Sequence, residues 1–241
     1  KIDDKETQIL HVEGGIPLSR DCYGHNVIGH PFIIIHLSSI RELAKDIITP
    51  AINENKLPAE VERLLNERIS DPALRNRLYD NILGLLRMEF SRTGGDIEKI
   101  VETIAPDIHI HELEHKRREQ LKLDKGDSDE ISSEVSALLF GIIKARVPYF
   151  HLAALAIMTL DGYKPADFLF TAIIKNLTPQ NLPELPSVCE KIYVEQTGSP
   201  LPSLQEFGDS WILTSPPVNA TGLIGPVRSN KSSGSPERSC I

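Results

Sequence analysis

Residues 149–160 read YFHLAALAIMTL, and this stretch decides the fold class of the protein. Drawn as a helix, it is apolar on nearly every side, which is typical of a helix at the centre of a core. It follows Val147-Pro148 and ends at Asp161-Gly162, and proline and glycine are common where helices begin and end. We therefore predict that the other elements pack around a buried helix over 149–160.

Helix signals continue on both sides of this stretch. Ser39 and Glu42 form a capping box, and Pro58 and Pro72 stand where first-turn prolines occur. The predicted helices are 40–49, 58–69, 72 to about 90, Asp96 to Pro106, 108 to about 123, 127–147, 149–160, about 165–175 and 187–196. The spacing thus predicts an all-α array of eight or nine helices. Its predicted core includes Leu139, Ile142, Leu152, Leu155, Ile157 and Phe168.

Only one stretch outside the helices has the composition of a strand. Residues 31–37 contain Phe-Ile-Ile-Ile between Pro and Ser, which favours β structure. Residues 1–30 mix glycines with scattered polar side chains, so we expect an irregular N-terminal arm. After the last helix Gly, Pro and Ser dominate, which predicts a disordered tail over 197–241. The α-helical domain is therefore expected to span 31–196.

The charge of the chain argues against nucleic acid as a partner. There are 34 acidic and 26 basic side chains, for a net charge of −8. No basic stripe interleaved with aromatic residues occurs, and such a stripe is the usual footprint of nucleic-acid binding. The hydrophobic content of 40% is that of an ordinary globular protein. The chain is also long enough to bury a core without disulfides or a structural metal.

The cysteines and the hydropathy pattern indicate an intracellular, cytoplasmic protein. Cys22, Cys189 and Cys240 lie far apart, so they form neither a disulfide framework nor a paired thiolate site. The longest strictly apolar run, 152–158, is too short to cross a bilayer, and the first residues have no signal-peptide profile. We expect no association with a membrane.

One short motif has the spacing of a metal site. His111-Glu112-Leu113-Glu114-His115 lies within the predicted helix 108–123. Two histidines four residues apart share a helix face, with β-carbons about 5 to 6 Å apart, as two imidazoles binding one zinc ion require. Glu112 is then placed to act as a general base toward a water activated by the metal.

At this motif the chain resembles the HExxH zinc metallopeptidases, the zincins, over about residues 107–137. In the glutamate-zincin branch a second helix supplies a glutamate as the third zinc ligand. Glu134 follows His115 at a matching distance, and Glu134-Val135-Ser136-Ala137 is similar to the Glu-x-x-Ala of that branch. Glu130, one turn earlier, is the substitute.

The resemblance implies a zinc cofactor and a peptide-hydrolysing activity. It implies His111, His115 and Glu134 as the metal ligands and Glu112 as the catalytic base. It also requires a group that stabilises the transition state, for which Tyr149 and His151 are the nearest downstream candidates. The family builds its cleft with a β-sheet whose edge strand holds the substrate, whereas a single strand is predicted here.

The same residues are compatible with a charged, solvent-facing helix. In that interpretation Ile108 and Leu113 face inward, while Glu112 and Glu114 contact Lys116 and Arg118 one turn later. The zincin helix usually carries uncharged residues at those positions. His109 extends the pattern to His-x-His-x-x-x-His, but in a helix it projects away from residue 111.

Two functions from different classes therefore remain open. The first is a non-catalytic helical protein that binds a protein partner or itself, because no catalytic set is recognisable outside residues 109–134. An exposed apolar stripe on a peripheral helix such as 40–49 is the expected surface for it. The alternative is a zinc-dependent hydrolase that uses the motif at 111–115.

Overall fold

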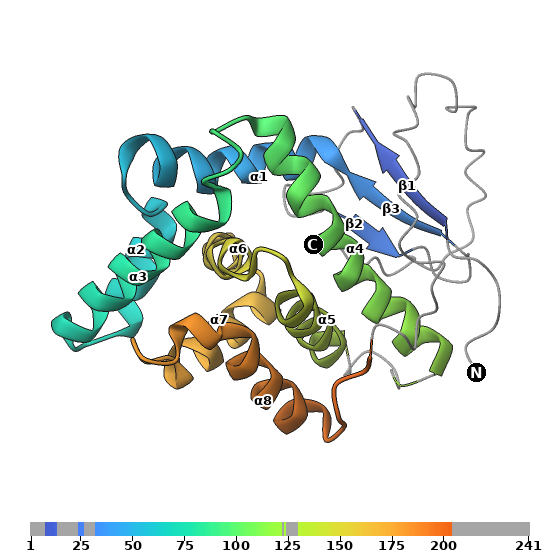
Figure 1. Cartoon of the computed structure of the whole chain (residues 1–241). Helices are drawn as coiled ribbons and strands as arrows, with labels where there is room; N and C mark the ends of the chain where they lie inside the picture. Colours follow the sequence, from blue (N-terminus) through green and yellow to red (C-terminus); the bar gives the residue numbers. More distant parts are fainter. Residues whose placement is uncertain (1–7, 14–23, 27–31, 122, 124–129, 204–241) are drawn as a thin grey trace.

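The computed structural model describes residues 8–13, 24–26, 32–121, 123 and 130–203. Eight α-helices make up most of this part of the chain, so the all-α prediction is confirmed (Figure 1). Their bounds are α1 Leu37–Thr49, α2 Ala59–Arg68, α3 Pro72–Phe90, α4 Ile97–Leu121, α5 Glu130–Lys144, α6 Pro148–Leu160, α7 Lys164–Asn176 and α8 Leu185–Thr197. A π-helical turn, η1 Pro50–Glu54, follows α1, and a 3-10 turn, η3 Leu182–Glu184, precedes α8.

Helix α6 lies at the centre of the core, as its sequence predicts. Of the residues expected in the core, four are at most 2% exposed: Leu139, Ile142, Leu152 and Leu155. Ile157 is partly buried against the same cluster. Phe168 was expected inside but is 46% exposed. The buried face of α7 instead contains Leu169 and Ile173, and Phe168 lies outside it.

A small three-stranded sheet packs at one end of the helices. β1 (Gln8–Val12) pairs parallel to β3 (Phe32–His36), and β2 (Gly24–Asn26) pairs antiparallel to β3, in the order β1-β3-β2. The expected single strand is therefore the central one of three. Two of its partners come from the segment 1–30, for which we expected no regular structure. β2 is short and polar, whereas β1 is mostly aliphatic, and both form because β3 offers hydrogen-bonding partners on its two edges.

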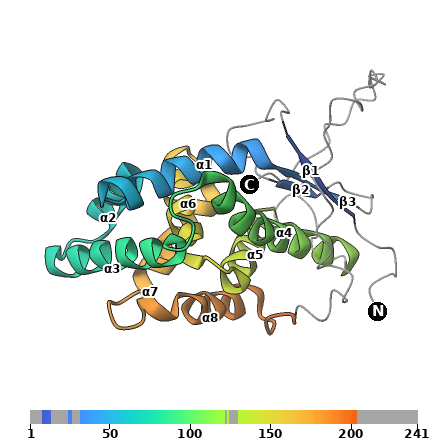
Figure 2. The ribbon, with the colours of Figure 1, turned by 45° about the horizontal axis from the view of Figure 1, so that its top comes forward.

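Helix α4 continues through Pro106, where the sequence predicted a break between two helices. Proline removes one backbone hydrogen bond and crowds the preceding turn, a cost that packing on several sides offsets. Helix α4 contacts α5, α1, β2 and β3, and it runs between the sheet and α5 in both views of the ribbon (Figures 1 and 2). This placement puts the His-Glu motif inside the molecule.

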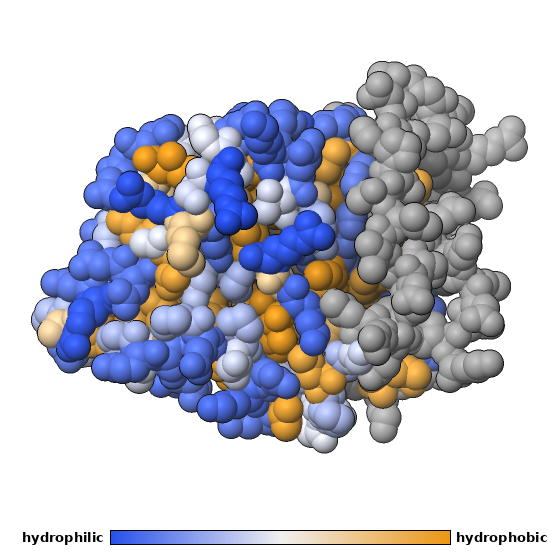
Figure 3. Space-filling model, in the orientation of Figure 1, coloured by the Kyte–Doolittle hydropathy of each residue, from blue (hydrophilic) through white to orange (hydrophobic). Residues whose placement is uncertain are grey.

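On the face shown in Figure 3, apolar surface is divided into small patches among hydrophilic side chains. The stripe of helix 40–49, expected to be an exposed contact surface, is instead buried in the core at Ile40, Leu43, Ala44, Ile47 and Ile48. Among the described residues, no helix has the length and apolar character needed to cross a membrane. The predicted tail lies outside the described residues from 204 onward, and α8 ends within one residue of the predicted boundary at 196.

Candidate metal centre

Three side chains from two helices converge on one point. His111 and His115 lie on α4 with their Nε2 atoms 2.9 Å apart. Glu134 lies on α5, with Oε1 3.4 Å from the Nε2 of His115 and Oε2 3.9 Å from the Nε2 of His111. Among the described residues this is the one group of three or more potential metal ligands whose donor atoms lie within 4.8 Å of one another. Glu130, the substitute, is the first residue of α5.

Close packing of α4 against α5 brings the three side chains together. At Gly141, a β-carbon on α5 would lie 3.4 Å from the β-carbon of His111, so a side chain larger than a methyl group would press against His111. Two residues after Glu134, Ser136 accepts a hydrogen bond from Arg118 Nη1 at 3.2 Å. Ser133 Oγ lies 3.5 Å from the Nδ1 of His115, the ring nitrogen other than the Nε2 that faces Glu134.

Glu112 lies beside this group on the side of the sheet. A β-carbon at Gly24 of β2 would lie 3.2 Å from Cγ of Glu112 and 3.1 Å from Cγ2 of Ile108. Only a residue without a side chain therefore lets the edge strand lie this close to α4. The four side chains of the candidate site are buried, with Glu112 at 0% and His115 at 6% exposure.

Burial and neighbouring charges shift the pKa values of His111 and His115 in opposite directions. Burial and the neighbouring His115 hold the pKa of His111 well below its usual value. Burial also acts to lower the pKa of His115, but the carboxylates of Glu134, Glu112 and Glu114 outweigh it and raise this pKa to about 9. The surroundings of His115 thus favour a positive charge at the point where the three side chains meet.

The other charged side chains in and just after the motif do not face solvent. Glu114 is fully buried and accepts two hydrogen bonds from Arg117, each 2.7 Å long. Tyr193 of α8 donates a third hydrogen bond to Glu114 Oε1 at 3.1 Å. Lys116 pairs with Glu119 at 2.9 Å. The interpretation of 108–123 as a solvated amphipathic helix is therefore wrong, because neighbouring elements cover its polar face.

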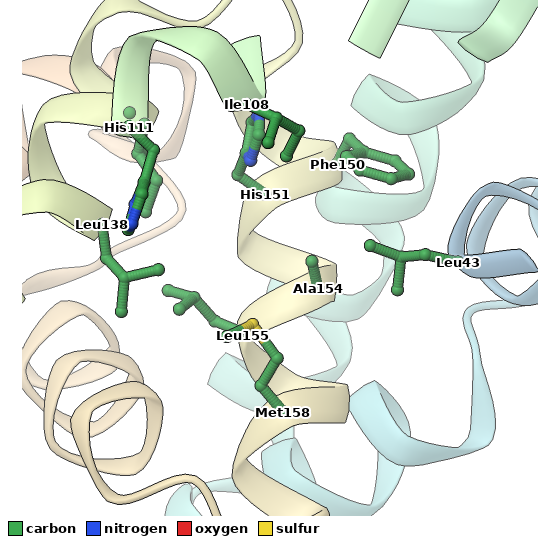
Figure 4. A pocket seen from close by; sticks show the side chains of 11 residues that line it. Leu43, Ile108, His111, Leu138, Phe150, His151, Ala154, Leu155 and Met158 are labelled. Carbon is green, nitrogen blue, oxygen red and sulfur yellow. The ribbon is translucent and has the colours of Figure 1, made fainter. Parts of the chain in front are cut away.

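Of the two candidates for transition-state stabilisation, His151 lies nearer the histidines. It lines a small cavity of about 20 Å³ together with His111 and apolar side chains that include Ile108 and Leu138 (Figure 4). Its Nε2 is 3.4 Å from Oδ2 of Asp107. Tyr149 instead donates its hydroxyl to the backbone oxygen of Leu182 at 2.9 Å. That hydrogen bond turns Tyr149 toward the start of α8.

Asp107 is a buried residue that the sequence did not single out for this role. Its carboxylate accepts hydrogen bonds from the backbone N–H groups of Arg146 and Val147, at 3.1 to 3.2 Å, in front of α6. It thereby fixes the first turn of α6, which carries His151, against α4. The sequence contained one indication of this role: Asp107 lies four residues before His111, and residues four apart share a helix face.

His109 does not join the group formed by His111 and His115. Its Nε2 lies 2.9 Å from Nε2 of His11 on β1, on another side of α4. Burial, together with the nearby His11, lowers the pKa of His109 to about 3. The expected divergence of residues 109 and 111 around the helix is therefore observed.

The chain has no match among protein-family models, curated proteins or solved structures.

Proposed function

We propose that this protein is a zinc-dependent hydrolase of the metallopeptidase type, with zinc bound by His111, His115 and Glu134. The observation that carries the proposal is the convergence of these three side chains from two helices. Two histidines and one glutamate are a known ligand set of catalytic zinc, which leaves a fourth position open for water or substrate.

The donor atoms fit a zinc ion in chemistry and in spacing. Tetrahedral ligands at about 2.0 to 2.1 Å from zinc lie about 3.3 to 3.4 Å from one another. The separations of 2.9, 3.4 and 3.9 Å among the three side chains bracket that value. The carboxylates around His115 that raise its pKa also favour a bound metal cation, which displaces the proton from this ring on binding.

The chemistry of hydrolysis is divided between the metal and the side chains. Zinc held by His111, His115 and Glu134 would supply polarisation of a substrate carbonyl and a water of lowered pKa. Glu112, the residue after His111 on α4, would act as the general base that takes a proton from the attacking water and returns it to the leaving amine. His151, whose Nε2 faces Asp107, would donate a hydrogen bond from Nδ1, as an imidazolium balanced by that carboxylate, to the substrate oxygen on which negative charge develops.

The described structure is a closed form of this site. His111, Glu112, His115 and Glu134 are each at most 6% exposed. The cavity beside His111, of about 20 Å³, has room for about one water molecule. A peptide substrate therefore reaches the zinc ligands only when one of the covering elements moves, which is common among enzymes that exclude water during catalysis.

The non-catalytic, interacting role predicted from the sequence was expected to use one particular surface. Its expected contact, the apolar stripe of helix 40–49, is part of the core. Binding to a protein partner or self-association, the absence of a nucleic-acid partner and the cytoplasmic location stay predictions.

Zinc content is the first test of the proposal. The full chain is purified without a histidine tag, and its bound zinc is measured by mass spectrometry together with His111→Ala and Glu134→Gln. We expect near-stoichiometric zinc in the wild type and a loss of at least tenfold in affinity in both variants. His36→Asn is the control, because His36 lies on β3 and is not one of the three converging residues. Wild-type protein without zinc above background contradicts the proposal.

An assay of peptide hydrolysis distinguishes residues that bind zinc from residues that act in catalysis. Glu112→Gln is expected to keep its zinc and to lose about 10² to 10⁴ of the rate toward a mixed peptide library, the usual contribution of a general base. His151→Gln is expected to keep its zinc and lose rate as well, with substrate affinity little changed. Wild-type protein that binds zinc but cleaves no peptide would limit the centre to a structural or storage role.

A further inference from the structure

A second pair of histidines lies on another side of α4 from the candidate metal centre. The Nε2 atoms of His11 on β1 and His109 on α4 are 2.9 Å apart, and their ring centroids are 5.0 Å apart. Residues 109 and 111 are separated by about 200° around the helix, since each residue of an α-helix turns the chain by about 100°. The pair is therefore separate from the site that contains His111.

Both imidazole rings are carried by regular elements of the core. His11 stands beside Ile35 in the register of the sheet, and the side chain of Ile35 is fully buried. His109 is 8% exposed on α4, which packs against β3. Donor atoms on strands and helices are held more precisely than donors on loops, so this pair needs little rearrangement to bind a ligand.

We infer that His11 and His109 bind a divalent transition-metal ion of the kind that prefers imidazole ligands. Two nitrogen donors at about 2.0 to 2.1 Å from one ion lie about 2.9 to 3.4 Å apart, in square-planar or tetrahedral geometry. The observed separation of 2.9 Å falls within that range. His11 is only partly buried, so water reaches the pair and completes the coordination of the ion.

The second site has fewer protein ligands than the first. In the part of the chain that the structure describes, no third His, Cys, Asp or Glu joins His11 and His109 in a group of converging donors. The ion therefore binds more weakly here than at His111, His115 and Glu134. Because one ligand is on β1 and the other on α4, the ion links the first strand of the sheet to the helix that carries the His-Glu motif.

A direct hydrogen bond between two neutral imidazoles explains the same distance without a metal. One ring then donates its Nε2–H to the Nε2 of the other. The two explanations differ in what the protein binds, so metal stoichiometry decides between them.

Nickel is a suitable probe, because Ni²⁺ favours imidazole ligands. Equilibrium dialysis of the metal-free full chain, without a histidine tag, is expected to give two bound Ni²⁺ ions at saturation in the wild type. His11→Ala and His111→Ala are each expected to bind one ion, and the double variant none. His36→Asn is the matched control and keeps two. A His11→Ala variant that binds as many ions as the wild type overturns the inference.

Thermal unfolding supplies a second readout that does not depend on the first site. In the His111→Ala background, Ni²⁺ is expected to raise the melting temperature, and adding His11→Ala is expected to abolish that rise. No rise in the His111→Ala background contradicts the second site. If wild-type protein binds one ion that His11→Ala removes and His111→Ala does not, this inference holds while the proposed zinc hydrolase fails.

Discussion

Zinc is expected to stabilise the fold by joining α4 to α5 through His111, His115 and Glu134. These residues lie on two helices that pack directly against each other, and an unfolded chain does not hold them together. A ligand that binds only the folded state at 100 times its dissociation constant contributes about 2.7 kcal/mol. For a domain of 150–250 residues each kcal/mol raises the melting temperature by about 2 to 4 °C, so the expected rise is about 5 to 11 °C.

The measurement is differential scanning calorimetry of metal-free protein titrated with Zn²⁺. It is made in the His11→Ala background, so that the second histidine pair does not contribute to the shift. Adding His115→Ala is expected to remove the rise, whereas adding His36→Asn keeps it even if the starting melting temperature changes. An equal rise with and without His115 would refute the reasoning, because the stabilisation would then come from zinc bound elsewhere.

Three further predictions follow from other parts of the structure. Burial raises the pKa of Glu89 to about 8 from 4.5, so the contribution of this carboxyl group to stability is expected to fall by about 1.4 kcal/mol per pH unit as the pH rises between these values. Glu89→Gln should flatten that slope in urea unfolding, and an unchanged slope contradicts the assignment. Tyr193→Phe removes a hydrogen bond to the buried Glu114 and should cost about 1.5 to 3 kcal/mol in the same assay, whereas a loss below 0.5 kcal/mol, the usual limit for surface changes, argues against that contact. Gly141→Val places a branched side chain against His111 and should cost about 1 to 3 kcal/mol and weaken zinc binding, while Gly84→Val, at an open position, should leave zinc affinity unchanged.

The helices themselves could be predicted from the sequence because their signals are local. Pro72 and Asp71 mark the start of α3, where the Asp71 side chain accepts a hydrogen bond from the backbone of Ala73. The spacing of His111 and His115 likewise placed both on one helix face. Local signals failed at Pro106 and in the segment 1–30, because contacts with distant elements outweighed the local preferences there.

The tertiary structure decided which chemistry-bearing residues meet. The sequence placed His111, Glu112 and His115 together and offered Glu134 and Glu130 as third ligands, but only the packing of α4 on α5 brings Glu134 to the two histidines. Packing also buries Glu114, which local charge patterns had assigned to solvent. Helical periodicity fixes which side chains share a face, while the partner of that face depends on contacts between residues far apart in the chain, which no local pattern records.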